Sequence, residues 1–268
     1  MNILITGSTD GIGKIAAIKL AQEGFHIYLH GRNPEKLAAT IAEVKRETKN
    51  ENISGFIADL SDLEAVKNMA NEVQKTVPIL DVLINNAGVF KSATTHNSQG
   101  LDLRFTVNFL APYLLTQELL PVLKKSNTPR VINLSSAAQS PINLDTLLGK
   151  NNQSENDTYA QSKLALTMWS FHLAAQEKDI ITIAVNPGSL LNTNMVKEAY
   201  GHHWSSAEKG GNVLYQLAIG EEYSKHSGDY FDNDKGEEIG IFGKAHEDAY
   251  NTYKIESLLE TTKGILNK

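Results

Sequence analysis

Cysteine is absent from this chain of 268 residues, and its absence excludes disulfides, thiolate metal sites and cysteine nucleophiles. Positive charge is scarce as well: the formal net charge is -6 at pH 7, which argues against a nucleic-acid surface. Metal-ligand spacing is also missing, because His202 and His203 are adjacent and would diverge on a regular element. The acidic residues between 232 and 238 do not fit an EF-hand loop. We therefore expect no metal, a solvated or substrate-lining histidine pair, and a solvated acidic loop.

Long hydrophobic runs are lacking too. The most apolar stretch, residues 109–123, contains two prolines, a glutamine and a glutamate, so it is too short and too polar to span a bilayer. No signal peptide precedes the first strand-like run, which passes directly into a glycine-rich turn. These absences predict a cytoplasmic protein without a membrane anchor.

Short apolar runs alternate with longer helical patterns along the chain. This alternation predicts an α/β fold with a doubly wound, Rossmann-like parallel sheet and helices on both faces, in one domain that spans residues 1–268. Ligands bind such sheets at the carboxyl ends of the strands. The long polar connections 137–157 and 192–212 are therefore expected to be substrate loops. The predicted strands are 2–6, 25–30, 53–58, 80–85, 130–135, 180–185 and, more weakly, 228–232. The predicted helices are 11–23, 34–49, 62–76, 99–125, 157–178, 206–219 and 245–263.

A glycine-rich turn joins the first predicted strand to the first predicted helix. Glycines permit a tight turn and let the backbone approach a diphosphate, which then lies at a helix N-terminus. The spacing G-x-x-x-G-x-G is neither the usual dinucleotide fingerprint nor a P-loop, and the alternative interpretation is an ordinary turn. The residues expected to contact a cofactor here are Gly7, Ser8, Thr9, Gly11, Ile12 and Gly13.

The second predicted strand is followed by Gly31 and Arg32. An acidic residue at this point would bind the adenosine ribose of NAD(H), whereas a guanidinium suits the 2′-phosphate of NADP(H). The sequence therefore predicts that NADP(H) is preferred and that NAD(H) is possible. The alternative for Arg32 is a solvated residue in a turn.

Polar residues also follow the third and fourth predicted strands. Asp59 and Leu60 are placed to meet the adenine, although Asp59 would serve equally well as a helix cap. Asn86, Ala87 and Gly88 suit a turn. Their place at the end of a strand favours contact with the cofactor or support of the glycine turn.

Tyr159 and Lys163 are spaced so that a phenol and an ammonium share one face of a predicted helix. The ammonium favours the phenolate and lowers a pKa that starts near ~10. Ser136, after the fifth strand, offers a hydroxyl to a carbonyl oxygen. These three groups suit proton donation to a carbonyl during its reduction. The alternative for Tyr159 and Lys163 alone is the surface of an amphipathic helix.

Taken in order, these residues resemble the short-chain dehydrogenase/reductase family. Within the family, the retinol dehydrogenase and WW-domain oxidoreductase group is the most similar, on the stretches Leu29-His-Gly-Arg32, Arg130-Val-Ile-Asn-Leu-Ser-Ser136 and Tyr159-Ala-Gln-Ser-Lys-Leu-Ala165. The resemblance covers roughly the first two hundred residues. No WW domain or membrane anchor accompanies it, so a retinoid substrate does not follow. The matching motifs are Thr6-Gly7-x-x-x-Gly11-x-Gly13, Asp59, Asn85-Asn86-Ala87-Gly88, Asn108, Ser136, Tyr159-x-x-x-Lys163 and Pro187-Gly188.

The resemblance implies a role for each of four residues. Tyr159 would be the general acid in reduction and the general base in oxidation, while Lys163 would bind the nicotinamide ribose and lower the pKa of Tyr159. Ser136 would bind the substrate oxygen, because the family usually uses the second serine of this pair. Neighbouring strand residues face opposite ways, so only one of Ser135 and Ser136 is expected to reach the site. Asn108 would help to hold a water that links Lys163 to solvent. Further cofactor contacts would come from Pro187, Gly188, Leu190 and Thr193.

Three departures from the family pattern bear on specificity. The gap between Ser136 and Tyr159 is longer than in the family's shorter members, which adds a loop beside the substrate. The segment 187–193 carries one residue more than usual, so Asn192 could replace Thr193 at the carboxamide. Asp10 stands in the glycine turn where some NADPH enzymes carry a base, which weakens the preference for NADP(H).

The leading interpretation is an NADP(H)-dependent oxidoreductase that interconverts an aldehyde or ketone and an alcohol, with a small-molecule substrate. One alternative is a non-catalytic, NADP(H)-binding regulator or redox sensor on the same fold. A sugar-nucleotide epimerase or dehydratase is disfavoured by the glycine spacing and the short C-terminal remainder. The broad apolar faces of 99–125 and 157–178 suggest a homodimer or homotetramer, unless both faces are simply core.

Overall fold

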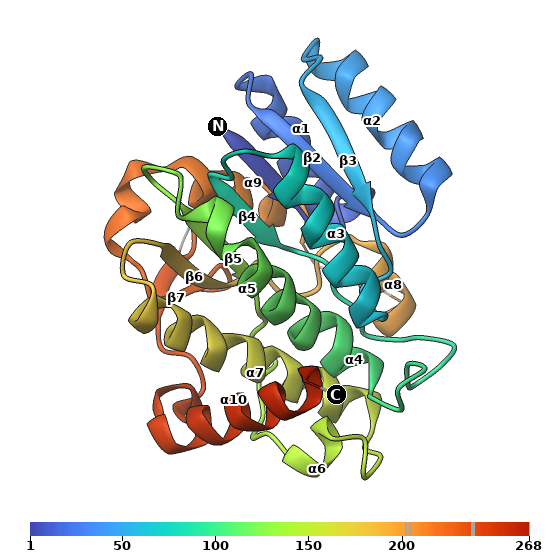
Figure 1. The fold of residues 1–268 in the computed structure, drawn as a ribbon, viewed down its shortest axis with the longest axis vertical. Coiled ribbons are helices and arrows are strands. Elements are labelled where there is room, and N and C mark those ends of the chain that lie inside the picture. The colour runs from blue at the N-terminus through green and yellow to red at the C-terminus, as the bar shows by residue number, and fades with distance from the viewer. Residues whose placement is uncertain (202, 204, 237–238, 268) are drawn as a thin grey trace.

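The computed structural model describes residues 1–201, 203, 205–236 and 239–267. The expectations for residues 202, 204, 237 and 238 lie outside this range. One eight-stranded sheet forms the centre of the molecule, in the order β3-β2-β1-β4-β5-β6-β7-β8, and Figure 1 shows the helices packed around it. The strands are β1 (Asn2–Ile5), β2 (His26–Gly31), β3 (Ile53–Ile57), β4 (Val82–Asn85), β5 (Arg130–Leu134), β6 (Ile181–Asn186), β7 (Tyr230–Asp232) and β8 (Ile241–Gly243).

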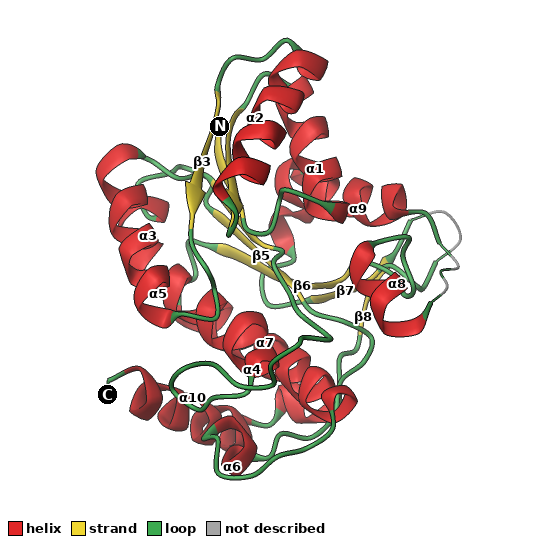
Figure 2. Ribbon diagram, turned by 90° about the vertical axis from the view of Figure 1, so that its right-hand side faces the viewer, coloured by secondary structure: helices red, strands yellow, loops and turns green. Residues whose placement is uncertain are grey.

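Helices cover both faces of the sheet, as Figure 2 shows. α1, α2 and α9 pack on one face, and α3, α5 and α7 pack on the other, where α10 lies against α7. The longer helices are α1 (Gly11–Gln22), α2 (Pro34–Thr48), α3 (Leu63–Thr76), α5 (Ala111–Leu123), α7 (Glu155–Gln176), α8 (Asn194–Tyr200), α9 (Ala207–Ile219) and α10 (Thr252–Leu266). The short ones are α4 (Leu103–Phe105), the π-helix η1 (Thr106–Leu110), α6 (Leu144–Leu147), η2 (Glu221–Lys225) and η3 (Glu247–Tyr250).

Side-chain caps set where several helices begin. Asp10 accepts a hydrogen bond from the Gly11 amide at the start of α1. Asn33 caps α2 ahead of a proline in its first turn, and Ser154 caps α7 through the Asp157 amide. Each cap satisfies an amide that the helix itself leaves unpaired. The caps of α1 and α7 therefore fix the starts of the two helices that border the candidate site.

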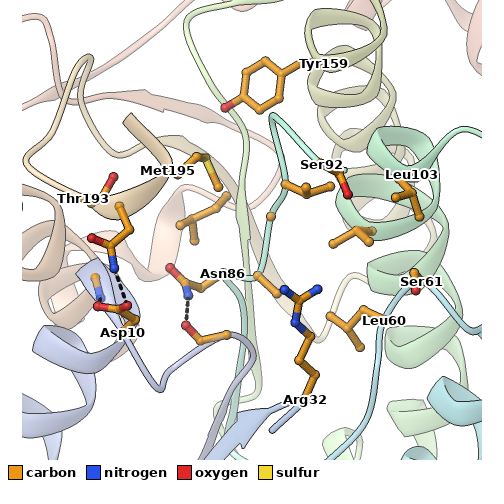
Figure 3. Close-up of a pocket in the computed structure, with 18 of the residues that line it drawn as sticks. Asp10, Arg32, Leu60, Ser61, Asn86, Ser92, Leu103, Tyr159, Thr193 and Met195 are labelled. Atoms are coloured by element: carbon orange, nitrogen blue, oxygen red, sulfur yellow. Dashed lines mark hydrogen bonds between the residues drawn. The ribbon is translucent and has the colours of Figure 1, made fainter. Parts of the chain in front are cut away.

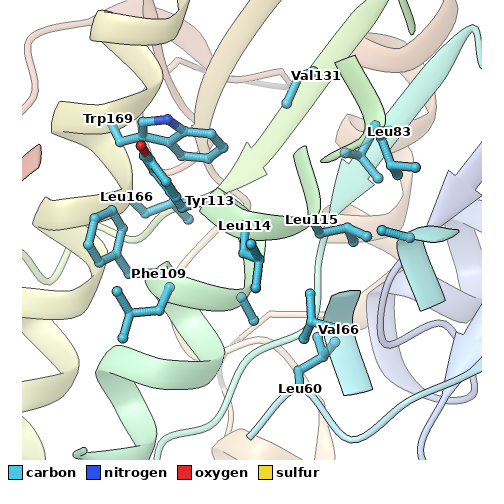
Figure 4. Close-up of a cluster of buried hydrophobic side chains, with 14 of the residues drawn as sticks. Leu60, Val66, Leu83, Phe109, Tyr113, Leu114, Leu115, Val131, Leu166 and Trp169 are labelled. Atoms are coloured by element: carbon cyan, nitrogen blue, oxygen red, sulfur yellow. The ribbon is translucent and has the colours of Figure 1, made fainter. Parts of the chain in front are cut away.

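Aromatic packing fixes α7 against α5 (Figure 4). Trp169 on α7 is 1% exposed, and its ring centroid lies 5.4 Å from that of Tyr113 on α5. Phe109 of η1 packs on Tyr113 with ring centroids 6.2 Å apart. Burying side chains of this size stabilises the fold by about 1.5–3 kcal/mol each. This core holds in place the helix that carries Tyr159 and Lys163.

The fold class is confirmed, with local corrections. β8 was not predicted, and it runs antiparallel to β7 at the edge of an otherwise parallel sheet. The expected helix 99–125 begins only at residue 103 and is interrupted by η1, and the expected helix 245–263 is divided into η3 and α10. Two further helices, α6 and α8, lie in the two expected substrate loops. These pieces are short, and so their sequences carry too few periods to be recognised.

The apolar residues of α5 and α7 are largely buried within the chain itself. Their burial favours the core alternative and removes those faces as an argument for an oligomer. None of the helices in the described ranges combines the length and apolarity needed to cross a membrane.

Candidate active site

The strand order reverses between β1 and β4, and a cavity of about 810 Å³ opens there at the carboxyl ends of the strands (Figure 3). Such a reversal point is the usual ligand site of an open α/β sheet. Most of the expected site residues line this cavity, and they come from every motif except Asn108. They are Gly7, Thr9, Gly11, Ile12, Arg32, Asp59, Leu60, Asn86, Ala87, Gly88, Ser136, Tyr159, Lys163, Pro187, Gly188 and Thr193.

Four expected site residues, Ser8, Gly13, Asn108 and Leu190, are not among those that line the cavity. Ser8 is fully buried, and its hydroxyl donates to the Ile5 carbonyl. Leu190 has a positive φ of 48°. Its neighbour Leu191 lines the cavity instead.

The glycine turn is packed against the segment after β4. Gly7 has φ +63°, and a Cβ on it would lie 2.8 Å from the Cα of Ala87. A Cβ on Gly13 would lie about 2.3 Å from Nδ2 of Asn86. That amide nitrogen donates to the carbonyls of Thr6 and Gly7 at 2.8 and 3.0 Å. Gly13 and Asn86 therefore support the turn from behind, as the supporting role predicted for Asn86 requires.

His30 supports the glycine turn, a role that the sequence motifs did not predict for it. Its Nδ1 lies 3.0 Å from the Gly7 amide, which can only donate, so Nδ1 accepts and Nε2 donates to the Ala58 carbonyl at 3.1 Å. Burial lowers the pKa of His30 to about 4. The imidazole is therefore neutral at pH 7 and holds one tautomer. It ties the turn to the ends of β2 and β3.

The end of the cavity at Arg32 carries exposed charge. Arg32 is exposed, points into the cavity (Figure 3), and forms no ion pair within the described ranges. Asp59 accepts hydrogen bonds from the amide and the hydroxyl of Ser61 at 2.9 and 2.8 Å, so it orders its own turn while lining the site. Arg32 thus has the capacity to bind an added anion.

Asp10, the departure in the glycine turn, has two side-chain partners. Nζ of Lys36 lies 2.9 Å from its carboxylate, and Nδ2 of Asn194 on α8 lies 2.7 Å away. Partial burial acts to raise the pKa of Asp10, but the hydrogen bonds and the charge of Lys36 outweigh it and lower the pKa. Lys36 therefore compensates much of the negative charge that Asp10 brings to the turn.

The other end of the cavity combines a buried ammonium with a half-buried phenol and hydroxyl. Lys163 is 4% exposed, its Nζ donates to the Leu134 carbonyl at 2.7 Å, and burial lowers its pKa to about 8. Nζ lies 5.6 Å from the centroid of the Tyr159 ring. That ring packs on Phe90 with centroids 4.7 Å apart. At pH 7 the ammonium is still mostly charged, so it favours the phenolate of Tyr159.

The two serines after β5 face different ways. The Ser135 hydroxyl is buried against α7, 3.1 Å from the Lys163 carbonyl and 2.6 Å from Oγ1 of Thr167. The Ser136 hydroxyl instead accepts from the Ala138 amide at 3.1 Å. Because that contact uses a lone pair and not the proton, the hydroxyl can donate to a ligand. This geometry supports the choice of Ser136 over Ser135.

Asn108 lies in η1 and is fully buried. Its Oδ1 accepts from the Val89 amide at 2.8 Å, and its Nδ2 donates to the Val89 carbonyl and to Oγ of Ser162, both at 3.0 Å. Both amide protons are therefore occupied by protein groups. The side chain clamps the segment after Gly88 to the helix of Tyr159, and single π turns of this kind are frequent at functional sites.

Two acidic residues that were expected to be solvated, Asp232 at the end of β7 and Asp234 just beyond it, hold the turn that follows β6. Asp234 accepts from the amide of Ser189 at 2.8 Å, and it shares Nδ2 of Asn186 with Asp232, each at 2.8 Å. Asp232 is only 6% exposed, so the prediction of a solvated loop is wrong for Asp232, whereas Asp234 is exposed as expected. They position Pro187 and Gly188, which line the cavity. Within the described ranges, no three His, Asp or Glu side chains converge as metal ligands would.

The model of the family described as short chain dehydrogenase matches residues 1–203. The chain belongs to the short-chain dehydrogenase family. The prediction made from the motifs is thereby confirmed. The family match covers the glycine turn and the Tyr159–Lys163 pair, but it ends before β7.

Several related proteins are similar over most of this chain. Human polyprenol dehydrogenase is 35% identical over 208 residues, which are 74% of this chain and 62% of that protein; the chain thus spans less than two thirds of its length. Human retinol dehydrogenase 13 is 32% identical over 250 residues, covering 86% of this chain and 75% of that one. A short-chain dehydrogenase from Shigella flexneri 2a, solved in complex with NADP, is 28% identical with a TM-score of 0.70, covering 86% of this chain and 95% of that one.

Proposed function

We propose that this protein is an NADP(H)-dependent oxidoreductase that interconverts a carbonyl group, in an aldehyde or ketone, and an alcohol. The observation that carries the proposal is the convergence of Ser136, Tyr159 and buried Lys163 at one end of a cavity whose other end presents Arg32. The NADP-bound Shigella relative and the dehydrogenases named above support the same chemistry.

The residues that line the cavity support binding of the cofactor in this orientation. The backbone at Gly11 and Ile12 lines the cavity at the N-terminus of α1, where a diphosphate is stabilised. A Cβ added to Gly11 would reach only Thr193, at 3.6 Å, so the space above the turn is open. Arg32 would hold the 2′-phosphate, and Thr193, rather than exposed Asn192, would meet the carboxamide.

Three side chains carry the proton chemistry. When bound, the nicotinamide supplies or accepts the hydride. In reduction, Ser136 donates a hydrogen bond to the substrate oxygen, and the hydroxyl of Tyr159 transfers its proton to that oxygen, which leaves a phenolate. Lys163 stabilises the phenolate and would also bind the nicotinamide ribose. In oxidation the same phenolate accepts the proton of the alcohol.

Purified protein mixed with NADPH or NADH and a panel of aldehydes, ketones, steroids and retinoids tests the proposal through the absorbance of the reduced cofactor. We expect turnover of at least one carbonyl compound, faster with NADPH. Cofactor binding without turnover of any carbonyl or alcohol would favour the non-catalytic regulator.

Location and assembly remain predictions. We propose a cytoplasmic location and a homodimer or homotetramer. Because the apolar faces of α5 and α7 are buried within the chain, an oligomer would have to use other surfaces. Light scattering coupled to gel filtration measures the assembly, and a monomeric mass across the concentration range would contradict it.

A further inference from the structure

Ser136 lies just beyond the end of β5, where the sheet no longer holds the backbone. β5 ends at Leu134, and the segment 135–143 has no regular secondary structure. A catalytic hydroxyl must nevertheless be held to within a fraction of an ångström of its working position. Other groups therefore have to fix this residue.

Two side chains from outside the strand bind the main-chain carbonyl of Ser136. The Tyr230 hydroxyl donates to it at 3.0 Å, and Nε2 of Gln139 donates to it at 2.9 Å. Gln139 is itself held, because its Oε1 accepts from the His246 amide at 3.3 Å. With the Ala138 contact to its hydroxyl, Ser136 is fixed at both its carbonyl and its side chain.

Tyr230 is well suited to a permanent contact. It is 3% exposed and stands in β7, paired in register with Ala184 of β6, so its ring has little freedom. Burial, together with the nearby charges of Asp232 and Asp234, raises its pKa well above the usual range. The hydroxyl therefore stays protonated and remains a donor throughout the working pH range.

We propose that Tyr230 and Gln139 are positioning residues that hold the Ser136 hydroxyl in place for the substrate oxygen, and that the chain beyond the family match at residue 203 thereby completes the active site. Tyr230 and His246, which holds Gln139, both belong to that C-terminal part. The proposal rests on the function assigned to Ser136 above. It adds residues that act on the reaction without touching the substrate.

The test combines Tyr230→Phe, which removes only the donor, with Tyr223→Phe as the matched control. Tyr223 is likewise buried at 9% exposure and packs on Phe231 of β7 with ring centroids 6.1 Å apart, and it makes no hydrogen bond to segment 135–139 among those the structure describes. Amide hydrogen exchange should become faster in residues 135–140 for Tyr230→Phe and should not change for Tyr223→Phe. If amide hydrogen exchange in residues 135–140 does not change in Tyr230→Phe, the proposal that Tyr230 positions Ser136 is wrong, whatever reaction the protein catalyses.

Steady-state kinetics provide a second test of the proposal. Tyr230→Phe should lower kcat roughly 2- to 10-fold, the range for one net hydrogen bond, with the Kd for NADPH unchanged. The same substitution in a Ser136→Ala background should produce no further loss, because the group that Tyr230 positions is gone. An equal loss of kcat in both backgrounds would mean that Tyr230 acts independently of the Ser136 hydroxyl and would overturn the proposal. If the wild type turns over no carbonyl, the proposed function is wrong. The hydrogen-exchange measurement then tests by itself whether Tyr230 holds the segment at Ser136.

Discussion

The two ends of the cavity differ in how far their charged groups are exposed to solvent. At the Tyr159 end, Lys163 is buried and its pKa is lowered to about 8, and its ammonium donates to the Leu134 carbonyl. At the Arg32 end, the charged groups are exposed, and Lys36 and Asp10 form a pair that is about half exposed. A charge acts strongly in a dry environment and weakly in water. We therefore expect proton chemistry at the first end, selection of the cofactor at the second, and mutational effects that decrease from one to the other.

The largest effect should come from Tyr159→Phe. The ring stays on Phe90, so the fold and most of the cofactor affinity should be retained. Turnover should fall by about 10²–10⁴-fold, as is typical when a general acid is lost. Steady-state kinetics with a thermal melt as control measure this. Near-normal turnover in the folded variant would show that Tyr159 does not transfer the proton.

Lys163→Met should lower oxidation at neutral pH on the order of 10- to 100-fold, because the phenolate loses its nearby positive charge. In the pH–rate profile for oxidation, the apparent pKa of the basic group, which sets the ascending limb at low pH, should move to higher pH, and cofactor affinity should drop. Lys163→Arg should restore only part of the activity, since the broader guanidinium cannot reproduce the contacts of the ammonium. If the pH–rate profile does not move and cofactor binding is intact in Lys163→Met, Lys163 takes no part in the reaction.

The same variant also tests the burial of Lys163 through stability. The folded pKa of about 8 lies below the usual value of 10.5, so between these values the unfolded chain binds more protons than the folded one. The stability of the wild type should therefore rise with pH across that interval relative to Lys163→Met. Tm against pH for both proteins, without cofactor, measures the difference. Parallel curves would contradict the burial of the ammonium.

At the exposed end, Arg32→Asp should move the preference from NADPH towards NADH. The loss of one charge-assisted contact corresponds to roughly tenfold in kcat/KM for NADPH, and the introduced carboxylate repels the 2′-phosphate. The ratio of kcat/KM for the two cofactors is the measurement. A wild type that uses both cofactors equally would remove the assigned role of Arg32.

The smallest effect belongs to Asp10→Asn. Asparagine still caps α1, while Lys36 loses its exposed partner and becomes available to a phosphate. Exposed pairs contribute little, so we expect KM for NADPH to fall by no more than about fivefold and KM for NADH to stay the same. A rise in KM for NADPH would show that Asp10 supports the site through Asn194 instead.

The sequence was sufficient for features whose signal is local. The turn at Gly7, the pair Tyr159 and Lys163, and the cation at Arg32 are all recognisable from spacing and strand order, and the structure places them in one cavity. The contacts of Tyr230 with Ser136 and of Asp234 with Ser189 join residues 94 and 45 positions apart. Hydrophobic periodicity is a local signal, so it cannot predict contacts of this kind. His30 was missed because a buried histidine in a strand has the same pattern as any core residue.

The π-helix at 106–110 makes the active site sensitive to chain length in an unusual way. A π turn holds one residue more than the α turn it interrupts, so the flanking helices α4 and α5 can keep their phase if that residue is removed. Deleting one residue within η1 should therefore leave the Trp169–Tyr113 core assembled while it turns Asn108 away from Val89. In this protein a single-codon deletion in the middle of a buried helix should spare the fold and damage the function.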